Sequence, residues 1–251
     1  YIPVLLETLK IPYTGAGLQC MMKCYNKEIT RNVAQSLGVS VPQGFVIHKN
    51  SGIIFPENFP VIVKPSFGDG SFGITQKSVV QDEAEFASSV LELRKIYEKD
   101  ILVEEFLQGD DLTLGIIGNP PEYSFVGITK EDFSCLHDYP KLPKIAGREA
   151  KWHPESPYWN ISPVAADLEK KTREKITSDS QLLFQELECR DYARFDWRLN
   201  SEGIPKLLEV NPNPGWCYDG HLARAAGLKK IIYSNMLDLI LKTAEKRLNF
   251  K

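Results

Sequence analysis

Two β-rich runs near the end of the chain, at residues 194–199 and 204–211, constrain its fold most, because the turn signal Asn200-Ser-Glu-Gly203 between them predicts a hairpin. With Leu199 opposite Ile204, an antiparallel ladder extends from the turn along both runs. The hairpin therefore predicts an antiparallel sheet in this half of the chain, and its register determines which side chains share a face.

Four polar side chains of this hairpin are expected on one face. In that register Arg194 lies opposite Glu209, and because side chains alternate between faces with a period of two, Asp196 and Asn211 join them. Two carboxylates and a carboxamide are hard oxygen ligands, which suit Mg²⁺ and leave positions open for nucleotide phosphates. The Arg194 guanidinium cannot bind a metal but can hold an anion beside it. The same pattern also fits an ordinary hairpin with a solvated charged face.

Length and composition limit the class of protein. The chain has 251 residues, of which 43% are hydrophobic, so it is long enough for one large or two small domains. Its formal net charge of -3 and pI near 5.9 arise from charges of both signs along the whole length, so neither nucleic acid nor an anionic membrane is expected as a partner. No apolar run approaches the roughly 18 to 20 residues of a membrane span, and no signal peptide is visible.

The cysteines indicate a reducing compartment. There are 5 of them, at positions 20, 24, 135, 189 and 217. An odd number of scattered cysteines fits reduced thiols in a cytoplasm better than a disulfide framework, so a cytoplasmic location is predicted. Cys20 and Cys24 have no second Cys or His pair nearby in the sequence, so no zinc site is expected.

The order of predicted elements indicates two α+β units. A short apolar-faced helix over residues 1–10 has nothing before it to pack on, which indicates that a domain precedes it. The first unit contains a helix capped by Asn26, a buried strand, a second strand after a glycine-rich turn, an amphipathic helix and a third strand, at residues 27–37, 60–65, 74–80, 82–98 and 101–107.

The second unit begins with two alternating strands, at residues 112–117 and 123–129. Residues 131–163 carry prolines, aromatics and charges without a clear period, and such a stretch in a compact domain is a functional lid or a disordered loop. A helix at 165–188, the hairpin and a closing helix at 230–248 complete the unit.

A glycine-rich turn follows the buried strand that ends in Lys64. A lysine at this position is costly to bury unless its ammonium meets an anion. The turn residues Gly70 and Ser71 offer backbone N–H groups and a hydroxyl to a phosphate, although a plain turn fits equally well. Lys27, at a helix start where the macrodipole disfavours a cation, raises the same question; the alternative is a solvated lysine.

An acidic segment joins the two units. Glu104-Glu-Phe-Leu107 is followed by Gly109-Asp-Asp111. A linker between domains is a place where backbone amides can hold a nucleotide base and a carboxylate can hold a ribose. An ordinary acidic strand end fits the same residues.

Taken in order, a strand-end lysine, a Gly/Ser loop, an acidic hinge, Arg-x-Asp and Glu-x-Asn closely resemble the ATP-grasp superfamily, specifically the D-Ala-D-Ala ligase family. The likeness covers essentially the whole chain. Its segments are Ile11-Pro-Tyr-Thr-Gly15, Val61-Ile-Val-Lys-Pro-Ser66, Glu149-Ala-Lys-Trp152, Leu207-Leu-Glu-Val-Asn-Pro-Asn-Pro-Gly215 and Ala225-Ala-Gly227.

This resemblance implies that ATP lies between two α+β domains. Two lysines and the glycine loop would contact its phosphates, Glu104 and the three residues after it would receive adenine, and Asp111 would hold the ribose. The ATP-binding residues implied in this way are Lys27, Lys64, Gly70, Ser71, Glu104, Glu105, Phe106, Leu107, Asp111 and Leu208.

The resemblance also implies the catalytic and metal-binding residues. Asp196, Glu209 and Asn211 match magnesium (or manganese) ligands, Arg194 matches the arginine that stabilises a tetrahedral intermediate, and Lys151 matches a lid lysine that reaches the γ-phosphate. Phosphoryl transfer to a carboxylate brings anions together, so a metal and cations must neutralise the charge that builds. A closed lid keeps the acyl phosphate from water.

The sequence departs from the family at the amino-acid sites. The family typically has a serine where Gly70 stands and an aromatic hydroxyl where Trp152 stands, and Asp219-Gly220 replaces a serine that helps bind the second substrate. A carboxylate at Asp219 would repel the carboxylate of an acceptor. The candidate substrate-binding residues are Trp152, Gly215, Asp219 and Gly220.

The predicted fold is α+β of the ATP-grasp type, with two α+β domains whose antiparallel sheets grip ATP. The predicted boundaries are 1–15 for a remnant of a missing N-terminal domain, 16–110 for the central subdomain and 111–251 for the C-terminal subdomain. The predicted function is an ATP-dependent carboxylate-amine ligase that forms a dipeptide through an acyl phosphate, D-Ala-D-Ala ligase or a close relative in peptidoglycan biosynthesis. A ligase for other amino acids or peptides and a non-catalytic ATP-binding sensor or scaffold are the alternatives. ATP, Mg²⁺ and amino acids are the expected ligands, and a homodimer through the missing domain is one expected assembly.

Overall fold

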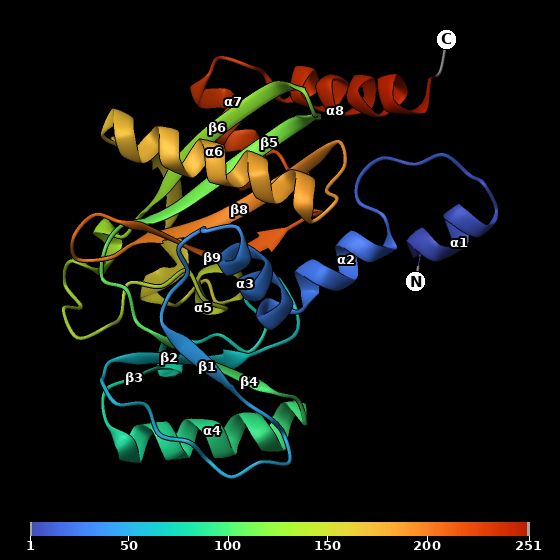
Figure 1. Cartoon of the computed structure of the whole chain (residues 1–251). Helices are drawn as coiled ribbons and strands as arrows, with labels where there is room; N and C mark the ends of the chain where they lie inside the picture. The colour runs from blue at the N-terminus through green and yellow to red at the C-terminus, as the bar shows by residue number, and fades with distance from the viewer. Residues whose placement is uncertain (1, 250–251) are drawn as a thin grey trace.

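Two antiparallel sheets form the framework of the protein (Figure 1). The computed structural model describes residues 2–249. The four-stranded sheet has the order β1-β4-β2-β3, with β1 at Gly44–Ile47, β2 at Val61–Pro65, β3 at Val79–Val80 and β4 at Ile101–Glu105. The five-stranded sheet has the order β7-β6-β5-β8-β9, with β5 at Asp111–Asn119, β6 at Glu122–Asp132, β7 at Ser162–Ala165, β8 at Tyr192–Leu199 and β9 at Pro205–Asn211.

Helix α4 (Glu83–Tyr97) covers the outer face of the four-stranded sheet, at the bottom of Figure 1. Asp82 caps the helix, because its carboxylate accepts from the N–H of Glu85 at 2.9 Å. Phe86, Val90 and Leu93 recur at helical spacing and are buried against the strands. The other face of this sheet is directed toward the five-stranded sheet.

The five-stranded sheet is covered on both faces. Helix α6 (Lys170–Glu186) packs on one face, where the alternate residues Leu112, Leu114 and Ile116 of β5 are buried. Helices α7 (His221–Leu228) and α8 (Tyr233–Leu248) pack against the opposite face at the end of the sheet marked by Ile117. The odd-numbered residues of β5 share this opposite face, which therefore continues from an apolar region under α7 and α8 toward the four-stranded sheet.

The first helices belong in space with the five-stranded sheet. Helix α1 spans Ile2–Thr8, α2 spans Leu18–Tyr25 and α3 spans Lys27–Ser36. Asn26 caps α3 as predicted, by accepting from the N–H groups of Glu28 and Ile29. Ala16 and the buried residues of α2 share one apolar core with α6 and β5. The boundaries 1–15, 16–110 and 111–251 stay a prediction. Any division of the chain into domains must take into account that α2 packs in the same core as α6 and β5.

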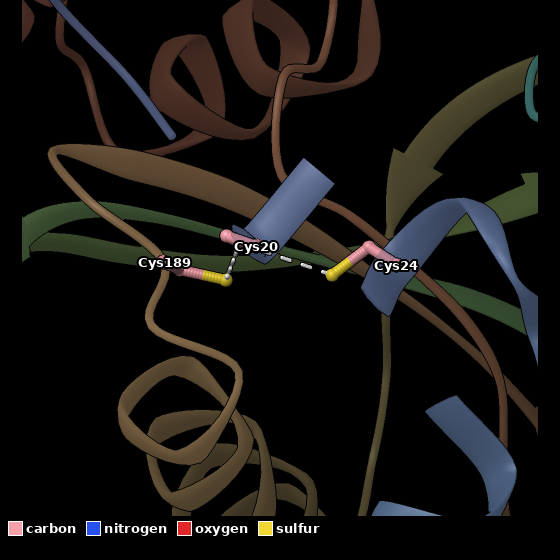
Figure 2. Close-up of side chains that lie close together, drawn as sticks. All are labelled: Cys20, Cys24 and Cys189. Carbon is pink, nitrogen blue, oxygen red and sulfur yellow. Dashed lines mark hydrogen bonds between the residues drawn. The ribbon is translucent and has the colours of Figure 1, made fainter. Parts of the chain in front are cut away.

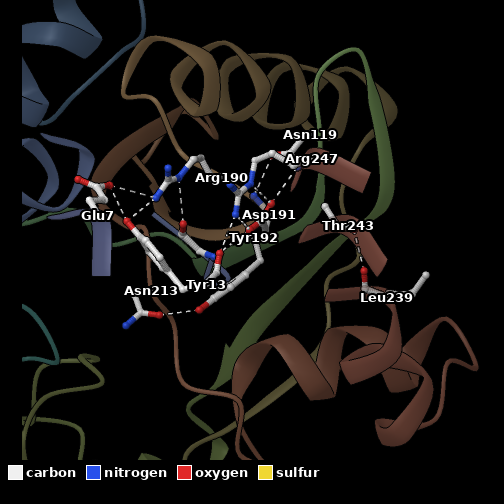
Figure 3. Close-up of polar contacts among 11 residues, drawn as sticks. Glu7, Tyr13, Asn119, Arg190, Asp191, Tyr192, Asn213, Leu239, Thr243 and Arg247 are labelled. Carbon is white, nitrogen blue, oxygen red and sulfur yellow. Dashed lines mark hydrogen bonds and ion pairs between the residues drawn. The ribbon is translucent and has the colours of Figure 1, made fainter. Parts of the chain in front are cut away.

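A buried carboxylate ties both ends of the described chain to the start of β8 (Figure 3). Arg247 of α8 donates from Nε to Asp191 Oδ1 and from Nη2 to Asp191 Oδ2, both at 2.8 Å, and Nη2 also donates to the carbonyl of Tyr13 at 2.8 Å. The N–H of Gly15 donates to Asp191 Oδ2 at 2.9 Å. Arg190 donates to the Tyr13 hydroxyl at 2.6 Å, which extends the network to the segment after α1.

Several predicted elements differ from the structure. The strand predicted at 74–80 is wrong over most of its length, because Gln76–Ser78 forms a 3-10 helix capped by Thr75 and only Val79–Val80 pairs with β2. The stretch 131–163 contains the short helix α5 (Glu149–Trp152) and 3-10 helices at Ser134–Leu136 and Pro157–Asn160. Local backbone hydrogen bonds form these elements, and the sequence of this stretch has no apolar period that could have predicted them. The predicted helix at 165–188 begins only at Lys170, after β7.

The predicted helix over 1–10 is present as α1, with Tyr1 outside the described residues. Helices α2 and α7 and strand β1 were not predicted. Within residues 2–249, no helix is long and apolar enough to cross a membrane.

Candidate active site

The β8–β9 hairpin forms with a register that differs from the predicted one. Leu199 pairs with Pro205 rather than with Ile204, and an irregularity between Asp196 and Trp197 shifts the ladder by one more residue. These two shifts together restore the parity, since a single shift would turn every side chain to the other face. The predicted pairing of Arg194 with Glu209 is therefore wrong, whereas the common face of these residues is confirmed.

The observed pairs are Arg194 with Asn211 and Asp196 with Glu209. Arg194 donates to Asp196 from Nε at 2.9 Å and from Nη2 at 2.8 Å, and its Nη2 lies 3.8 Å from Glu209 Oε1. Burial opposes the charge of Arg194, but these carboxylates outweigh it and raise the pKa of the guanidinium. Asn211 Oδ1 accepts from the N–H of Asn213 at 3.0 Å. The hairpin thus offers two carboxylates and an amide around a permanently charged arginine.

A cavity of about 120 Å³ lies between the two sheets and is the centre of the candidate active site. The four-stranded sheet contributes Ile62 and Lys64, whereas the five-stranded sheet contributes its charged face. The lining from the five-stranded sheet is Asp111, Thr113, Glu131, Arg194, Asp196, Arg198, Leu208 and Glu209. Ser71, in the turn after β2, and Lys151, in the stretch after β6, complete the lining of the cavity.

Two predicted phosphate-binding lysines are buried beside carboxylates. Lys64 Nζ forms an ion pair with Glu104 Oε2 at 2.5 Å, without the alignment of a hydrogen bond, and Arg31 donates to the other oxygen of the same carboxylate. Lys27 Nζ donates to the carbonyl of Gly68 at 2.5 Å and lies 3.7 Å from Glu209 Oε2. Burial lowers the pKa of Lys27. Lys64 thus lines the cavity and Lys27 lies behind its Glu209, and an incoming anion could replace the partners of both lysines.

The glycine-rich turn and the short helix α5 are in contact. Lys151 Nζ donates to Ser71 Oγ at 2.9 Å, and Ser71 Oγ donates to the carbonyl of Ala146 at 3.2 Å. Lys151 is exposed along its stem, but its ammonium lies in the cavity, where burial lowers its pKa. Gly70 has φ +63° and open space at its Cβ position, so its left-handed backbone rather than crowding favours glycine there.

Of the predicted hinge residues, Asp111 lines the cavity, whereas Glu105, Phe106 and Leu107 lie outside its lining. The N–H groups of Glu105 and Phe106 donate to the carbonyls of Gln43 and Pro60, at 2.8 and 3.0 Å, and Leu107 is buried. Asp111 Oδ2 lies 3.5 Å from Arg198 Nη1, yet burial raises the pKa of Asp111 to about 6.

The predicted substrate-binding residues lie outside the lining of this cavity. Trp152 follows Lys151 on α5 and is 71% exposed. Gly215 and Asp219 are exposed in the segment between β9 and α7, and Gly220 is the N-cap residue of α7. The structure thus brings together predicted metal and phosphate groups, and these four residues are not part of that cluster.

The sequence analysis missed the buried pair of Glu131 and His221. His221 Nδ1 lies 3.2 Å from Glu131 Oε1 on the cavity wall. Burial raises the pKa of Glu131 to about 8 and lowers the pKa of His221 to about 3, so both groups are uncharged near neutral pH. The alternation of β6 could have placed Glu131 on the cleft face, but no local signal links it to a histidine 90 positions later. Thr113, which donates to Asp196 Oδ1 at 3.2 Å, and Arg198 were also missed.

Two α+β layers with cations and carboxylates converging between antiparallel sheets define an ATP-grasp architecture, as predicted. The sequence matches the family described as "D-ala D-ala ligase C-terminus" over residues 51–242, and the chain belongs to this family. The prediction of a ligase-family enzyme is confirmed by this membership.

Named relatives agree with the family. The chain is 28% identical over 243 residues to a D-alanine–D-alanine ligase of Bacillus anthracis, covering 95% of this chain and 73% of the relative. It is 24% identical over 245 residues to a D-alanine–D-alanine ligase of Clostridium beijerinckii, covering 96% of this chain and 75% of the relative. The crystal structure of the Bacillus anthracis ligase complexed with ATP has a TM-score of 0.76 at 24% identity, covering 98% of this chain and 74% of that one, which shows the same fold.

Proposed function

We propose that the protein is an ATP-dependent carboxylate-amine ligase that joins two amino acids through an acyl phosphate, with D-alanine as the first substrate to consider. The observation that supports this proposal is the cavity between the sheets. Lys64, Lys151 and Arg194 converge there with the Asp196 and Glu209 carboxylates. Transfer of a phosphoryl group to a carboxylate requires cations around the reacting anions and oxygen ligands for a metal.

Asp196, Glu209 and Asn211 would hold Mg²⁺ or Mn²⁺. Their oxygens are the hard ligands that these ions take, and Asp196 and Glu209 are opposite each other in the ladder. The metal, when bound, would neutralise charge on the phosphates of ATP. Arg194 lies against both carboxylates, so it is positioned to stabilise an oxyanion that develops beside them.

The remaining ATP contacts are proposed as follows. Lys27 and Lys64 would exchange part of their present pairing with carboxylates for contacts with phosphate oxygens. Gly70 and Ser71 would approach the same phosphates through backbone N–H groups. Glu104 would receive adenine together with the backbone of Glu105, Phe106 and Leu107, while Asp111 would hold the ribose and Leu208 would line the base.

We infer that the segment around Lys151 acts as a lid, and its contact with Ser71 supports a closed arrangement. The cavity of about 120 Å³ is smaller than the roughly 300–1,000 Å³ of pockets that take small ligands. ATP binding therefore requires α5 to move away from the glycine-rich turn, after which Lys151 can return to the γ-phosphate. Closing the lid again would exclude water from the acyl phosphate.

A ligase for other amino acids or peptides is the second candidate, and three departures from the family pattern support it. Asp219 is exposed and stands where the resemblance implies a serine that helps bind the acceptor, so its charge would oppose an acceptor carboxylate. Trp152 and Gly70 both lack the hydroxyl expected of a D-Ala-D-Ala enzyme. A homodimer is the proposed assembly for either candidate ligase.

The test is phosphate release by the full-length protein with Mg-ATP and a panel of D- and L-amino acids, with products identified by mass spectrometry. Phosphate release that depends on an amino acid, together with a dipeptide of matching mass, is expected. The pair with the highest kcat/KM separates the two candidates. No phosphate release with any amino acid, while Mg-ATP still binds, would overturn the ligase proposal in favour of an ATP-binding sensor or scaffold.

A further inference from the structure

Three cysteines that are far apart in the sequence meet in the core of the protein (Figure 2). Cys20 and Cys24 lie one helical turn apart on α2, and Cys189 lies between α6 and β8. The Sγ of Cys20 is 3.9 Å from that of Cys24 and 3.6 Å from that of Cys189, and all three sulfurs lie within 4.8 Å of one another. Among residues 2–249, this is the one set of three or more Cys, His, Asp or Glu ligands that converges so closely.

The sulfur spacing is that of ligands around one metal ion. Three sulfurs at about 2.3 Å from a zinc-sized ion are separated by about 3.8 to 4.0 Å, for tetrahedral or trigonal angles. The two measured separations of Cys20 lie at or just below this value. Soft thiolates select soft ions such as Zn²⁺ and Cu⁺ over Mg²⁺, so the set is chemically distinct from the oxygen ligands of the cleft.

The surroundings of the sulfurs favour a small, closed site. Cys20 is 1% exposed, Cys24 is 4% exposed and Cys189 is 6% exposed. Lys23, at the surface beside the site, is paired with Glu188 at 2.5 Å and places a cation near the sulfurs.

We propose that Cys20, Cys24 and Cys189 bind one thiophilic d10 metal ion, of the Zn²⁺ or Cd²⁺ type, through three thiolates. The thiol protons that remain pass to solvent as the metal–sulfur bonds form, so uptake releases protons. The site is separate from the proposed nucleotide cleft and does not depend on the proposed ligase function.

A metal at this position would act as a clamp. Cys24 lies three residues before Lys27, and Cys189 lies five residues before Arg194. The ion would therefore join α2, which is followed by Lys27 at the start of α3, to the segment that leads into β8, the strand that carries Arg194. This predicts that metal uptake stabilises the fold and reduces the motion of Lys27 relative to the hairpin.

Two other states of the same sulfurs are outcomes of the test. Three buried cysteines can pack as small apolar side chains. Alternatively, Cys20 and Cys189 come from different elements and are close enough that air oxidation could join them. If either state is the native one, the reduced protein should not bind a metal ion tightly at these sulfurs.

The experiment titrates the reduced protein with Cd²⁺ and, separately, with Zn²⁺ under nitrogen. An ultraviolet thiolate-to-cadmium absorption band that saturates at one ion per chain is expected, with release of protons and a rise in Tm. The single variants Cys20→Ala, Cys24→Ala and Cys189→Ala should each weaken binding at least about 100-fold, since loss of even an outer contact of a metal site costs 10–100-fold. The double variant Cys135→Ala/Cys217→Ala is the matched control and should retain one ion per chain.

The titration of the unaltered protein decides the question even where a core variant fails to fold. No saturable thiolate band, or a band that disappears in the Cys135→Ala/Cys217→Ala control, would overturn the proposal. A Cys20–Cys189 disulfide in the air-exposed protein, combined with no uptake after reduction, would also overturn it.

Discussion

The hairpin β8–β9 and the short helix α5 both supply proposed catalytic groups to one cavity, but they are supported in opposite ways. Arg194 and Asp196 stand on a strand with neighbours on both sides, and Thr113 of β5 donates to the same carboxylate. Helix α5 has four residues and none of them is buried. The ammonium of Lys151 on this helix makes one side-chain hydrogen bond, to Ser71.

This difference matches what each group is proposed to do. Metal ligands and an oxyanion partner need fixed geometry, which a hydrogen-bonded sheet provides. A lysine that must leave for ATP to bind and return to its phosphate needs a weakly stabilised segment. We therefore expect the residues of the hairpin to be more rigid than the segment around α5.

The largest effect is expected for Arg194→Lys in the hairpin. Lysine keeps the charge but loses the two parallel N–H donors, so kcat should fall roughly 10²- to 10³-fold, as on removal of an oxyanion donor. Arg190→Lys, two residues before β8 and outside the cavity lining, is the control and should change kcat by no more than about twofold, because its hydrogen bonds go to Tyr13 and Gly15 and not to the cavity. Steady-state kinetics and Tm measure both, and equal effects of the two changes would contradict a special role for Arg194.

Glu209→Gln should weaken Mg-ATP binding by at least about 10- to 100-fold while leaving the fold intact, because it removes a charge from the metal site without changing volume. Glu202→Gln, in the turn of the same hairpin, is the matched control. Isothermal calorimetry gives both affinities, with and without Mg²⁺. Unchanged Mg-ATP affinity in Glu209→Gln would refute the assignment of this residue as a ligand.

The third prediction concerns the effect of pH on Glu131, which lines the cavity beside the hairpin. Burial raises the pKa of Glu131 from 4.5 to about 8, so the folded protein holds a proton that the unfolded chain releases between these values. The free energy of unfolding should therefore fall as pH rises from about 4.5 to 8. Glu131→Gln should remove a pH-dependent decline in the free energy of unfolding on the order of 2 kcal/mol. One pKa unit corresponds to about 1.4 kcal/mol, and relaxation of the residues around Glu131 reduces the full effect. Parallel pH profiles from urea unfolding would show that Glu131 does not titrate in this way.

The smallest effect is expected on the lid. Lys151→Met removes the hydrogen bond to Ser71, worth about 1 kcal/mol, so amide exchange over residues 146–152 should accelerate about fivefold while the hairpin is unaffected. Lys141→Met, in the same irregular stretch, is the control. Hydrogen–deuterium exchange with mass spectrometry measures both, and Mg-ATP should slow exchange of this segment in the unaltered protein. Equal exchange in hairpin and lid would remove the contrast between the two regions.

Local sequence patterns predicted the parts of the fold that depend on neighbouring residues. Asn26 and Asp82 cap helices where the sequence places them. Strands β2 and β4 lie within the predicted ranges, and β5 and β6 contain theirs and extend past them at both ends. The hairpin register was predicted wrongly because a bulge leaves no mark in an alternating pattern. The parity survived only because the turn and the bulge each shift the ladder by one residue.

The sequence by itself determined the chemistry that this protein can hold: a charged hairpin face, a strand-end lysine, a glycine-rich turn and an acidic hinge, in the order of one family. Only the tertiary structure decided which distant groups meet. Glu104 pairs with Lys64 and Arg31, Glu131 faces His221, and Cys189 contacts Cys20, 169 positions earlier. The physical reason is that capping and alternation act over a few residues, whereas these contacts arise from the packing of sheets and helices that no local pattern encodes.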